Sequence, residues 1–328
     1  MREFASHIPK ISAYRSKLLK NKVHRFFMGS KETHGVLFST AVYVLLIVIG
    51  FVYVYPLLYM FVTSIKPLRD LLNESVKWIP TAVYFDNYEQ AIKVLDFSHS
   101  LLNTILLTGV SSILQVAIAS LTGYGFARYH FRGKGILFAV LIIAFILPQQ
   151  ATLVPTYLLF KDLGIIGTIK AFVYPAALGQ GLKSTVIVLI FYQFYKQIPL
   201  SLVEAAQLDG CGQIRIFWSI ALPSVSAAFL IGFLFSFVWY WNETYLTSLF
   251  ISNTGLGNQH SVSTLLIKLQ AFEESYKNMN QADSGSVNRI NESIRMAGTM
   301  LCITPLLVLY AFLQRYFVES IDRVGLKD

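Results

Sequence analysis

The sequence predicts an all-α, polytopic membrane protein with six transmembrane helices. Hydrophobic residues make up 55% of the 328 residues and charged residues only 14%, whereas soluble domains carry about 25% charged residues. The mean hydropathy is +0.55. The apolar residues also gather in runs long enough to cross a bilayer, which takes about 20 residues per helix. This composition excludes an ordinary soluble enzyme and a disordered regulator.

Six apolar runs justify the six spans in chain order. The first two runs carry no charge, the fourth contains Lys183, and the fifth is interrupted by Glu243. Prolines inside the runs are compatible with spans, because neighbouring helices satisfy the freed backbone groups. The first run is about twice as long as the apolar region of a cleavable signal. The runs cover residues 35–62, 101–127, 135–160, 171–195, 224–252, and 295 or 296 to 314.

The distribution of lysine and arginine predicts the orientation, because cytoplasmic loops carry an excess of both. Residues 1–34 contain eight of them, and the short link after the second run contains three without an acidic neighbour. The longer links 63–100 and 253–293 are close to charge balance. Both termini are therefore predicted in the cytoplasm. The links 63–100, 161–170 and 253–293 are then outside, and 196–223 is inside.

Three segments divide the chain: a basic cytoplasmic arm at 1–34, a six-helix domain at 35–318 and a cytoplasmic tail at 319–328. The arm mixes apolar residues with cations, which fits either an amphipathic segment on the inner leaflet or a tethered tail. The formal charge of +9 is interpreted as attraction to an anionic membrane face rather than to nucleic acid. The two cysteines and six histidines have no ligand spacing, so no metal site is expected.

The cytoplasmic link 196–223 is predicted to contain two short helices. Ser201 and Glu204 match the S-x-x-E pattern of a capping box, so the first helix is expected at about 202–208. Pro199 separates it from the preceding span.

A turn and a second short helix complete this elbow. Gly210 and Gly212 allow a turn with positive φ, and the second helix is expected at about 213–221. Apolar side chains on both helices need cover. Two interpretations stay open: the helices lie on lipid, or they dock a soluble partner.

A resemblance favours docking. The residues from Glu204 to Pro223 match the pattern EAA-x3-G-x9-I-x-LP at every fixed position. This pattern is the signature of ABC importer permeases, so the chain resembles that family, and the resemblance implies the type I ABC importer permease fold. In the family the elbow seats in a cleft of the ATP-binding subunit. The resemblance thereby implies ATPase-coupling roles for Glu204, Ala205, Ala206, Asp209, Gly210, Leu222, Pro223 and, in the tail, Lys327.

The resemblance extends along nearly the whole chain and is strongest to maltose-permease-like subunits of carbohydrate importers. It implies a bacterial cytoplasmic-membrane protein with four kinds of partner: a homologous second permease, two ATP-binding subunits, an extracytoplasmic binding protein and an oligosaccharide. The chain ends in Asp328, where the family's tail ends in glycine. The other segments that carry the resemblance are 103–104, 123–128, 155–165, 241–243 and 325–328.

The chain lacks a nucleotide site of its own. Residues 179–185 resemble a phosphate-binding loop, but their spacing is wrong and they lie inside an apolar run. ATP and Mg²⁺ are therefore expected on the partner subunits, and no cofactor or catalytic residue is expected in this chain.

Lys183 is one candidate for the translocation pathway, because a lysine at a helix centre costs roughly 2.5–3.5 kcal/mol and such charges usually face a cavity or a partner. It would suit an acidic oligosaccharide such as a uronate. The alternative is that it reaches the outer interface.

A second group of candidates follows in the fifth run. Aromatic rings stack on sugar faces and amides bond to hydroxyls, which favours carbohydrate passage. An aromatic belt at the interface is the alternative for Trp239 and Tyr240, and Glu243 could instead pair with Lys183. Arg128, at an inner helix end, is expected to be an interface anchor. The candidates are Trp241, Asn242, Glu243 and Tyr245.

Competing functions are weaker on this sequence. An importer permease for another small solute is the nearest alternative. An ion-coupled secondary transporter would need buried carboxylates and an internal repeat and would leave the elbow unexplained. A membrane-bound enzyme would need a reactive set of side chains, and none is apparent. The sequence does not say which sugar is carried, or which permease subunit holds it.

Overall fold

The structure is a computed structural model that describes residues 29–30, 33–252, 262–282 and 291–325. One short antiparallel pair, β1 (Gly29–Ser30) with β2 (Thr33–His34), precedes a series of helices. Most of the predicted arm at 1–34 and the tail residue Lys327 lie outside the described residues. The predicted tail region up to Gly325 continues the last helix.

Three helices are each long and apolar enough to cross a membrane, and three bent pairs raise the number of possible spans to six. The long helices are α2 (Val36–Ser64), α5 (Phe97–Arg128) and α17 (Glu292–Gly325). The first bent pair is α6 (Lys134–Ile146) with α7 (Gln149–Asp162), and the second is α9 (Ser184–Gln197) with α10 (Leu200–Leu208). In the third pair, the first member is a segment of three consecutive elements, α11 (Gln213–Ile216), π-helical η2 (Phe217–Ala221) and α12 (Leu222–Ser224). Its second member is α13 (Ser226–Asn242).

Three of the six predicted runs are broken helices. The third run bends by 98° between α6 and α7, where Pro148 begins the second helix. The fourth run contains α8 (Lys170–Ala177) and α9, separated by a turn in which Gly179 and Lys183 have positive φ. The fifth run leaves the helix after α13 and continues as α14 (Tyr245–Thr247) and π-helical η3 (Ser248–Ser252).

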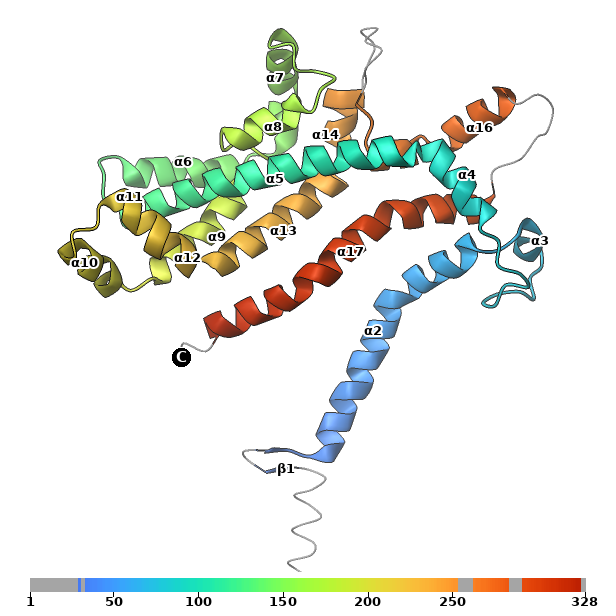
Figure 1. Cartoon of the computed structure of the whole chain (residues 1–328), viewed down its shortest axis with the longest axis horizontal. Coiled ribbons are helices and arrows are strands. Elements are labelled where there is room, and N and C mark those ends of the chain that lie inside the picture. Colours follow the sequence, from blue (N-terminus) through green and yellow to red (C-terminus); the bar gives the residue numbers. More distant parts are fainter. Residues whose placement is uncertain (1–28, 31–32, 253–261, 283–290, 326–328) are drawn as a thin grey trace, which may run out of the picture.

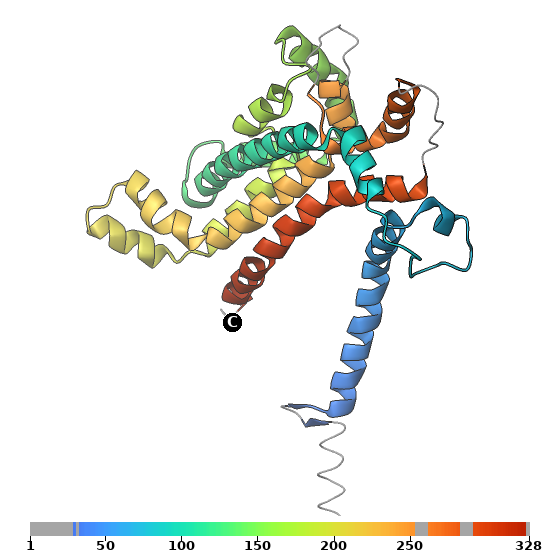
Figure 2. The ribbon, with the colours of Figure 1, turned by 45° about the vertical axis from the view of Figure 1, so that its right-hand side comes forward.

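The helices separate two ends of the molecule (Figures 1 and 2). The elbow helices α10 and α11 and the end of α17 lie on one side, and the short helices α3, α4 and α16 lie on the other. This arrangement places the links 63–100 and 196–223 at opposite ends of the described structure. The short helices are α3 (Leu68–Leu71), α4 (Asp86–Leu95), α15 (Leu265–Gln270) and α16 (Phe272–Ala282).

Helix α5 is the centre of the bundle, between α8, α9 and α13 (Figure 1). Its buried face is small and polar rather than bulky, so neighbouring backbones can come close. The hydroxyls of Ser120 and Tyr195 lie 2.7 Å apart. A Cβ on Gly123 would lie 2.7 Å from Cβ of Phe191. The polar members of the buried face are Ser100, Thr104, Thr108, Ser111, Ser112, Gln115 and Ser120.

Helix α2 departs from this bundle. The C-terminal part of α2 contacts α17, and the rest of α2 points away from the bundle (Figures 1 and 2). Its only buried residues are Thr63 and Ser64. The apolar surface of α2 is therefore available to lipid or to another subunit.

We expect Gly123→Ala to destabilise the protein, because its Cβ would overlap the backbone of α9 and overpacking costs about 1–3 kcal/mol. Gly125→Ala is the matched control, since nothing lies within 4 Å of a Cβ there. Thermal unfolding of the purified complex checks the pair. Equal melting temperatures for both variants would contradict the close approach of α5 and α9.

Candidate functional site

The elbow projects from the bundle between α9 and α13. Ile198 and Pro199 have extended backbones, so the chain turns by 69° between α9 and α10. The predicted capping box is wrong: α10 begins at Leu200, Pro199 occupies the N-cap position, and no side chain caps the helix. Ser201 is already inside the first turn, because the fixed φ of proline starts the helix two residues earlier than a serine cap would.

The turn after α10 is closed by two backbone hydrogen bonds. The N–H of Cys211 donates to the carbonyl of Ala206 at 2.9 Å, and the N–H of Gly210 donates to that of Gln207 at 3.0 Å. This pair forms a Schellman motif, which requires a left-handed residue at the C′ position. Gly210 supplies it with φ of 78°. Open space surrounds a Cβ at Gly210, so backbone conformation, rather than room, demands glycine there.

One face of the elbow is exposed and apolar, and the other is anchored. Ala206, Ile216 and Phe217 are buried. Glu204, Ala205, Asp209, Gly210 and Pro223 are exposed, and Leu222 is half-buried. The exposed large apolar side chains are Leu200, Leu202, Leu208, Ile214 and Trp218. So much exposed apolar surface on two short helices is typical of a docking surface.

Helix α5 holds the base of the elbow. A guanidinium N–H of Arg128 donates to the carbonyl of Ile198, the residue between α9 and α10. The ring of Tyr124 packs on two other rings, with centroid distances of 4.8 Å to Phe217 and 5.1 Å to Tyr195. The sequence suggested an interface anchor at Arg128, and the structure gives this side chain a specific partner. The elbow is thus tied to two helices of the bundle.

The five predicted pathway residues do not form one site in this structure. Lys183 is the N-cap of α9 and exposed, with Nζ 4.9 Å from the centroid of the Trp239 ring. Trp241 is only 3% exposed and stacks on Phe237.

The other three lie nearby but face different partners. Asn242 donates to the carbonyl of Val238. Glu243 accepts the N–H of Leu246 at 2.9 Å, and no ion pair joins it to Lys183, although both are described. Tyr245 is 62% exposed.

A buried hydrogen-bonded set lies beside them. The amide of Gln115 donates to the carbonyl of Leu182 at 2.7 Å, and the hydroxyl of Tyr240 donates to Oε1 of Gln115 at 2.7 Å. The N–H of Leu182 donates to the Tyr240 hydroxyl at 3.2 Å. Gly181 leaves room for this set, since a Cβ there would lie 2.3 Å from Oε1 of Gln115. Helices α5 and α13 thereby satisfy the backbone of the break between α8 and α9.

A cavity of about 150 Å³ adjoins this set. Its walls combine aromatic rings with hydroxyl and amide groups, which is the mixture that small-molecule sites use. The lining includes Thr152, Thr156, Phe172, Gln180, Tyr240 and Phe250. The sequence interpretation considered Tyr240, with an aromatic belt as the alternative, but missed the other lining residues, although Gln180 was visible as an amide inside an apolar run.

Comparison with known families identifies the family of the chain. The family described as "Binding-protein-dependent transport system inner membrane component" matches residues 115–323, well over half of the chain, including the whole elbow. The chain belongs to this family. It is therefore a multi-pass membrane subunit of an ABC importer, a non-catalytic permease, as the signature in the elbow predicted.

Known permeases are similar along most of the chain. The osmoprotective compounds uptake permease protein of Synechocystis sp. is 27% identical over 85% of this chain and 89% of its own. The polygalacturonan/rhamnogalacturonan transport system permease protein of Bacillus subtilis is 26% identical over 87% and 96%. The melibiose/raffinose/stachyose import permease protein of Bacillus subtilis is 28% identical over 83% and 91%.

A solved structure shows the same fold. One chain of a bacterial ABC transporter involved in the import of the acidic polysaccharide alginate matches with a TM-score of 0.70 and 20% identity. The match covers 86% of this permease and 96% of that chain. The predicted type I ABC importer permease fold is confirmed.

Gly210→Ala should strain the elbow of the permease by about 1–2 kcal/mol, the cost of a Cβ in the left-handed region. We expect weaker stimulation of ATP hydrolysis in the assembled importer. Gly212→Ala is the control, because Gly212 has an extended backbone and open space around it. Gly210→Asn should recover part of the activity, since asparagine tolerates this conformation. Equal activity of both alanine variants would refute the Schellman requirement.

Tyr240→Phe should lower the stability of the permease by about 1–3 kcal/mol, because it leaves Oε1 of Gln115 and the N–H of Leu182 buried without a partner. Tyr174→Phe, on the exposed side of α8, loses the same hydroxyl without this consequence. Thermal unfolding of the two variants checks the difference. If the Tyr240→Phe variant has the same melting temperature as the wild type, the hydrogen-bonded set does not stabilise the break between α8 and α9.

Proposed function

We propose that this permease is one of two homologous transmembrane subunits of an ATP-driven, binding-protein-dependent importer of carbohydrate. The observation that carries the proposal is the elbow: an exposed apolar helix–turn–helix with the complete EAA signature, at one end of a membrane bundle. Two ATP-binding subunits, which bind ATP and Mg²⁺, and an extracytoplasmic binding protein complete the importer.

The elbow is the mechanical link to the ATP-binding subunits. Glu204, Ala205 and Ala206 lie on α10, and Asp209 and Gly210 form its C-terminal turn. Closure of the ATP-binding subunits displaces this helix. The displacement passes into the bundle through the anchored side, where Phe217 packs among α5 and α9.

Alternating access follows from where these anchors attach. Helix α9 enters the elbow and α13 leaves it, and both also contact α5. A shift of the elbow therefore changes the angle of α9 and α13 against α5. We propose that this motion turns the pathway from inward-facing to outward-facing. Leu222 and Pro223 lie at the exit, where the chain bends by 72° into α13.

Carbohydrate is the substrate class that the lining supports. The cavity beside Tyr240 presents rings for stacking on sugar C–H faces, together with hydroxyl and amide groups for sugar hydroxyls. Two of the relatives above are named for polysaccharides or oligosaccharides. The exposed ammonium of Lys183, on the adjoining turn, suits an acidic oligosaccharide. Another small solute, as in the osmoprotectant relative, is the alternative.

We further propose that both termini are cytoplasmic. The excess of lysine and arginine in residues 1–34 and after the second span supports this orientation. The elbow and the end of α17 also lie at the same end of the molecule (Figure 1). The outer links 63–100, 161–170 and 253–293 would then receive the binding protein.

The test is ATP hydrolysis by the importer reconstituted with its partner subunits. Sugar-loaded binding protein should stimulate hydrolysis, and Glu204→Ala should reduce the stimulation about tenfold, the effect of losing one charge-assisted hydrogen bond at the docking surface. Glu274→Ala, an exposed glutamate on α16 at the opposite end, is the control.

A panel of neutral oligosaccharides, uronate oligosaccharides and osmoprotectants identifies the solute. Stimulation by osmoprotectants alone would overturn the carbohydrate proposal. A chain that recruits no ATP-binding subunit, and whose Glu204→Ala variant behaves as wild type, would overturn the coupling role of the elbow.

A further inference from the structure

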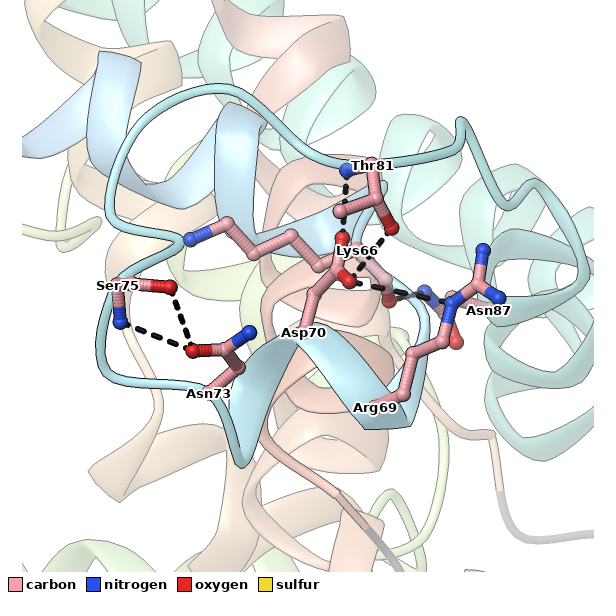
Figure 3. Close-up of polar contacts among 7 residues, drawn as sticks. All are labelled: Lys66, Arg69, Asp70, Asn73, Ser75, Thr81 and Asn87. Atoms are coloured by element: carbon pink, nitrogen blue, oxygen red, sulfur yellow. Dashed lines mark hydrogen bonds and ion pairs between the residues drawn. The ribbon is translucent and has the colours of Figure 1, made fainter.

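The connection between α2 and α4 forms a folded loop with its own polar core (Figure 3). The ammonium of Lys66, only 5% exposed, donates to the carbonyls of Val76 at 3.0 Å and Lys77 at 2.7 Å. Asp70, 3% exposed, accepts hydrogen bonds from the N–H and the hydroxyl of Thr81, both at 2.7 Å. These bonds hold the loop in one shape.

The charges of this core are settled by the same contacts. Hydrogen bonding from Thr81 holds the pKa of Asp70 below its usual range, so the carboxylate stays ionised. Asn87 donates to the carbonyls of Ser64 and Lys66 at 2.9 Å each, which ties the loop to the end of α2. The loop is therefore preorganised rather than a loose connection.

A cavity of about 260 Å³ lies between this loop and the end of α2. Two buried polar groups face it with bonding capacity left over. An ammonium carries three N–H donors, and the hydrogen bonds to Val76 and Lys77 use two of those of Lys66. Thr63, 1% exposed, lines the cavity, and its hydroxyl has no hydrogen-bond partner among the described residues. A buried hydroxyl and a buried cation with spare donors favour an anionic ligand.

The rest of the lining changes from polar to aromatic along α2. Glu74 lies on the loop side with an exposed carboxylate. On the helix side, Tyr55 and Tyr59 form edge contacts with Trp78, with centroids 5.2 and 6.5 Å apart. All three rings are about two-fifths exposed. One wall is therefore polar and charged, and the other is aromatic and open.

The position of the cavity matches the headgroup layer. The 29 residues of α2 measure about 43 Å along the helix axis, long enough to reach across a bilayer with its headgroups at about 40–45 Å. Thr63 lies one residue before the end of α2, and Tyr55 lies about 12 Å from it along the helix axis. In the orientation proposed above, the cavity lies at the outer end of the first span, with its aromatic wall toward the hydrocarbon. Tyrosine and tryptophan prefer this depth.

We infer that this cavity binds the phosphate headgroup of a membrane phospholipid. The phosphate oxygens accept from Lys66 and Thr63. The donor end of the headgroup, an ammonium or a hydroxyl, faces Glu74. The acyl chains pass Tyr59 and Tyr55 along the exposed surface of α2. A lipid bound there connects α2 with the loop that leads from α2 to α4.

The test uses the assembled importer, stripped of lipid in detergent. Short-chain phosphatidylethanolamine and phosphatidylglycerol are titrated, with native mass spectrometry for binding and thermal unfolding for stabilisation. Wild type should bind one lipid that Thr63→Val binds about tenfold more weakly, as expected for losing a hydrogen bond to a charged group. Without lipid, Thr63→Val should be at least as stable as wild type, because the lost hydroxyl is unpartnered.

Controls separate the sources of the effect. Thr40→Val makes the same change at the other end of α2 and should leave lipid binding unchanged. Lys66→Met should abolish binding, and Thr63→Val keeps the test decisive if Lys66→Met fails to fold. Inorganic phosphate alone should stabilise wild type far less than the lipids do.

Three results would overturn the inference. Lipid affinity could be the same in wild type and Thr63→Val. Inorganic phosphate could give the full stabilisation, which would make the ligand a free anion. The variants could weaken stimulation by the binding protein without changing lipid binding, which would assign the cavity to protein docking.

Discussion

Every break in a membrane-spanning helix exposes backbone groups that lipid cannot satisfy, and this permease has such a break between α8 and α9. Gln115 from α5 and Tyr240 from α13 form hydrogen bonds to both backbone groups of Leu182. The hydroxyl of Ser184 donates to the carbonyl of Gly179 at 2.7 Å. The position of α9, and with it the start of the elbow, depends on these few bonds. They also form one wall of the cavity beside Tyr240.

The same constraint explains why the elbow can transmit motion. To transmit motion, the elbow must be rigid and must be firmly attached to the bundle. The Schellman turn at Gly210 sets the angle between α10 and α11, and the contacts of Arg128 and Tyr124 tie the base to α5. The exposed apolar face is then free to bind a partner. The helices that enter and leave the elbow are those that pack on α5, so docking and pathway share one framework.

The sequence interpretation succeeded where a local pattern has one physical meaning. Runs of apolar residues predicted the membrane class, and the elbow signature predicted the family that the comparison confirms. It was less successful inside the spans. The fourth run was treated as one helix, although Gly179 and Lys183 have positive φ and end it. The capping box at Ser201 failed because Pro199 occupies the N-cap position and α10 begins at Leu200. Trp241 packs against Phe237 in the structure, and its place in the pathway stays a prediction.

The sequence by itself determined the membrane character, the family and the place of the elbow. These depend on composition and on residues close together in the chain, so distant contacts do not alter them. Tertiary structure alone decided which polar groups meet. Gln115 and Tyr240 are 125 residues apart, and Thr63 faces a cavity closed by Trp78 and Glu74. These long-range contacts depend on the angles at which the helices cross. The apolar pattern of each helix does not specify those angles.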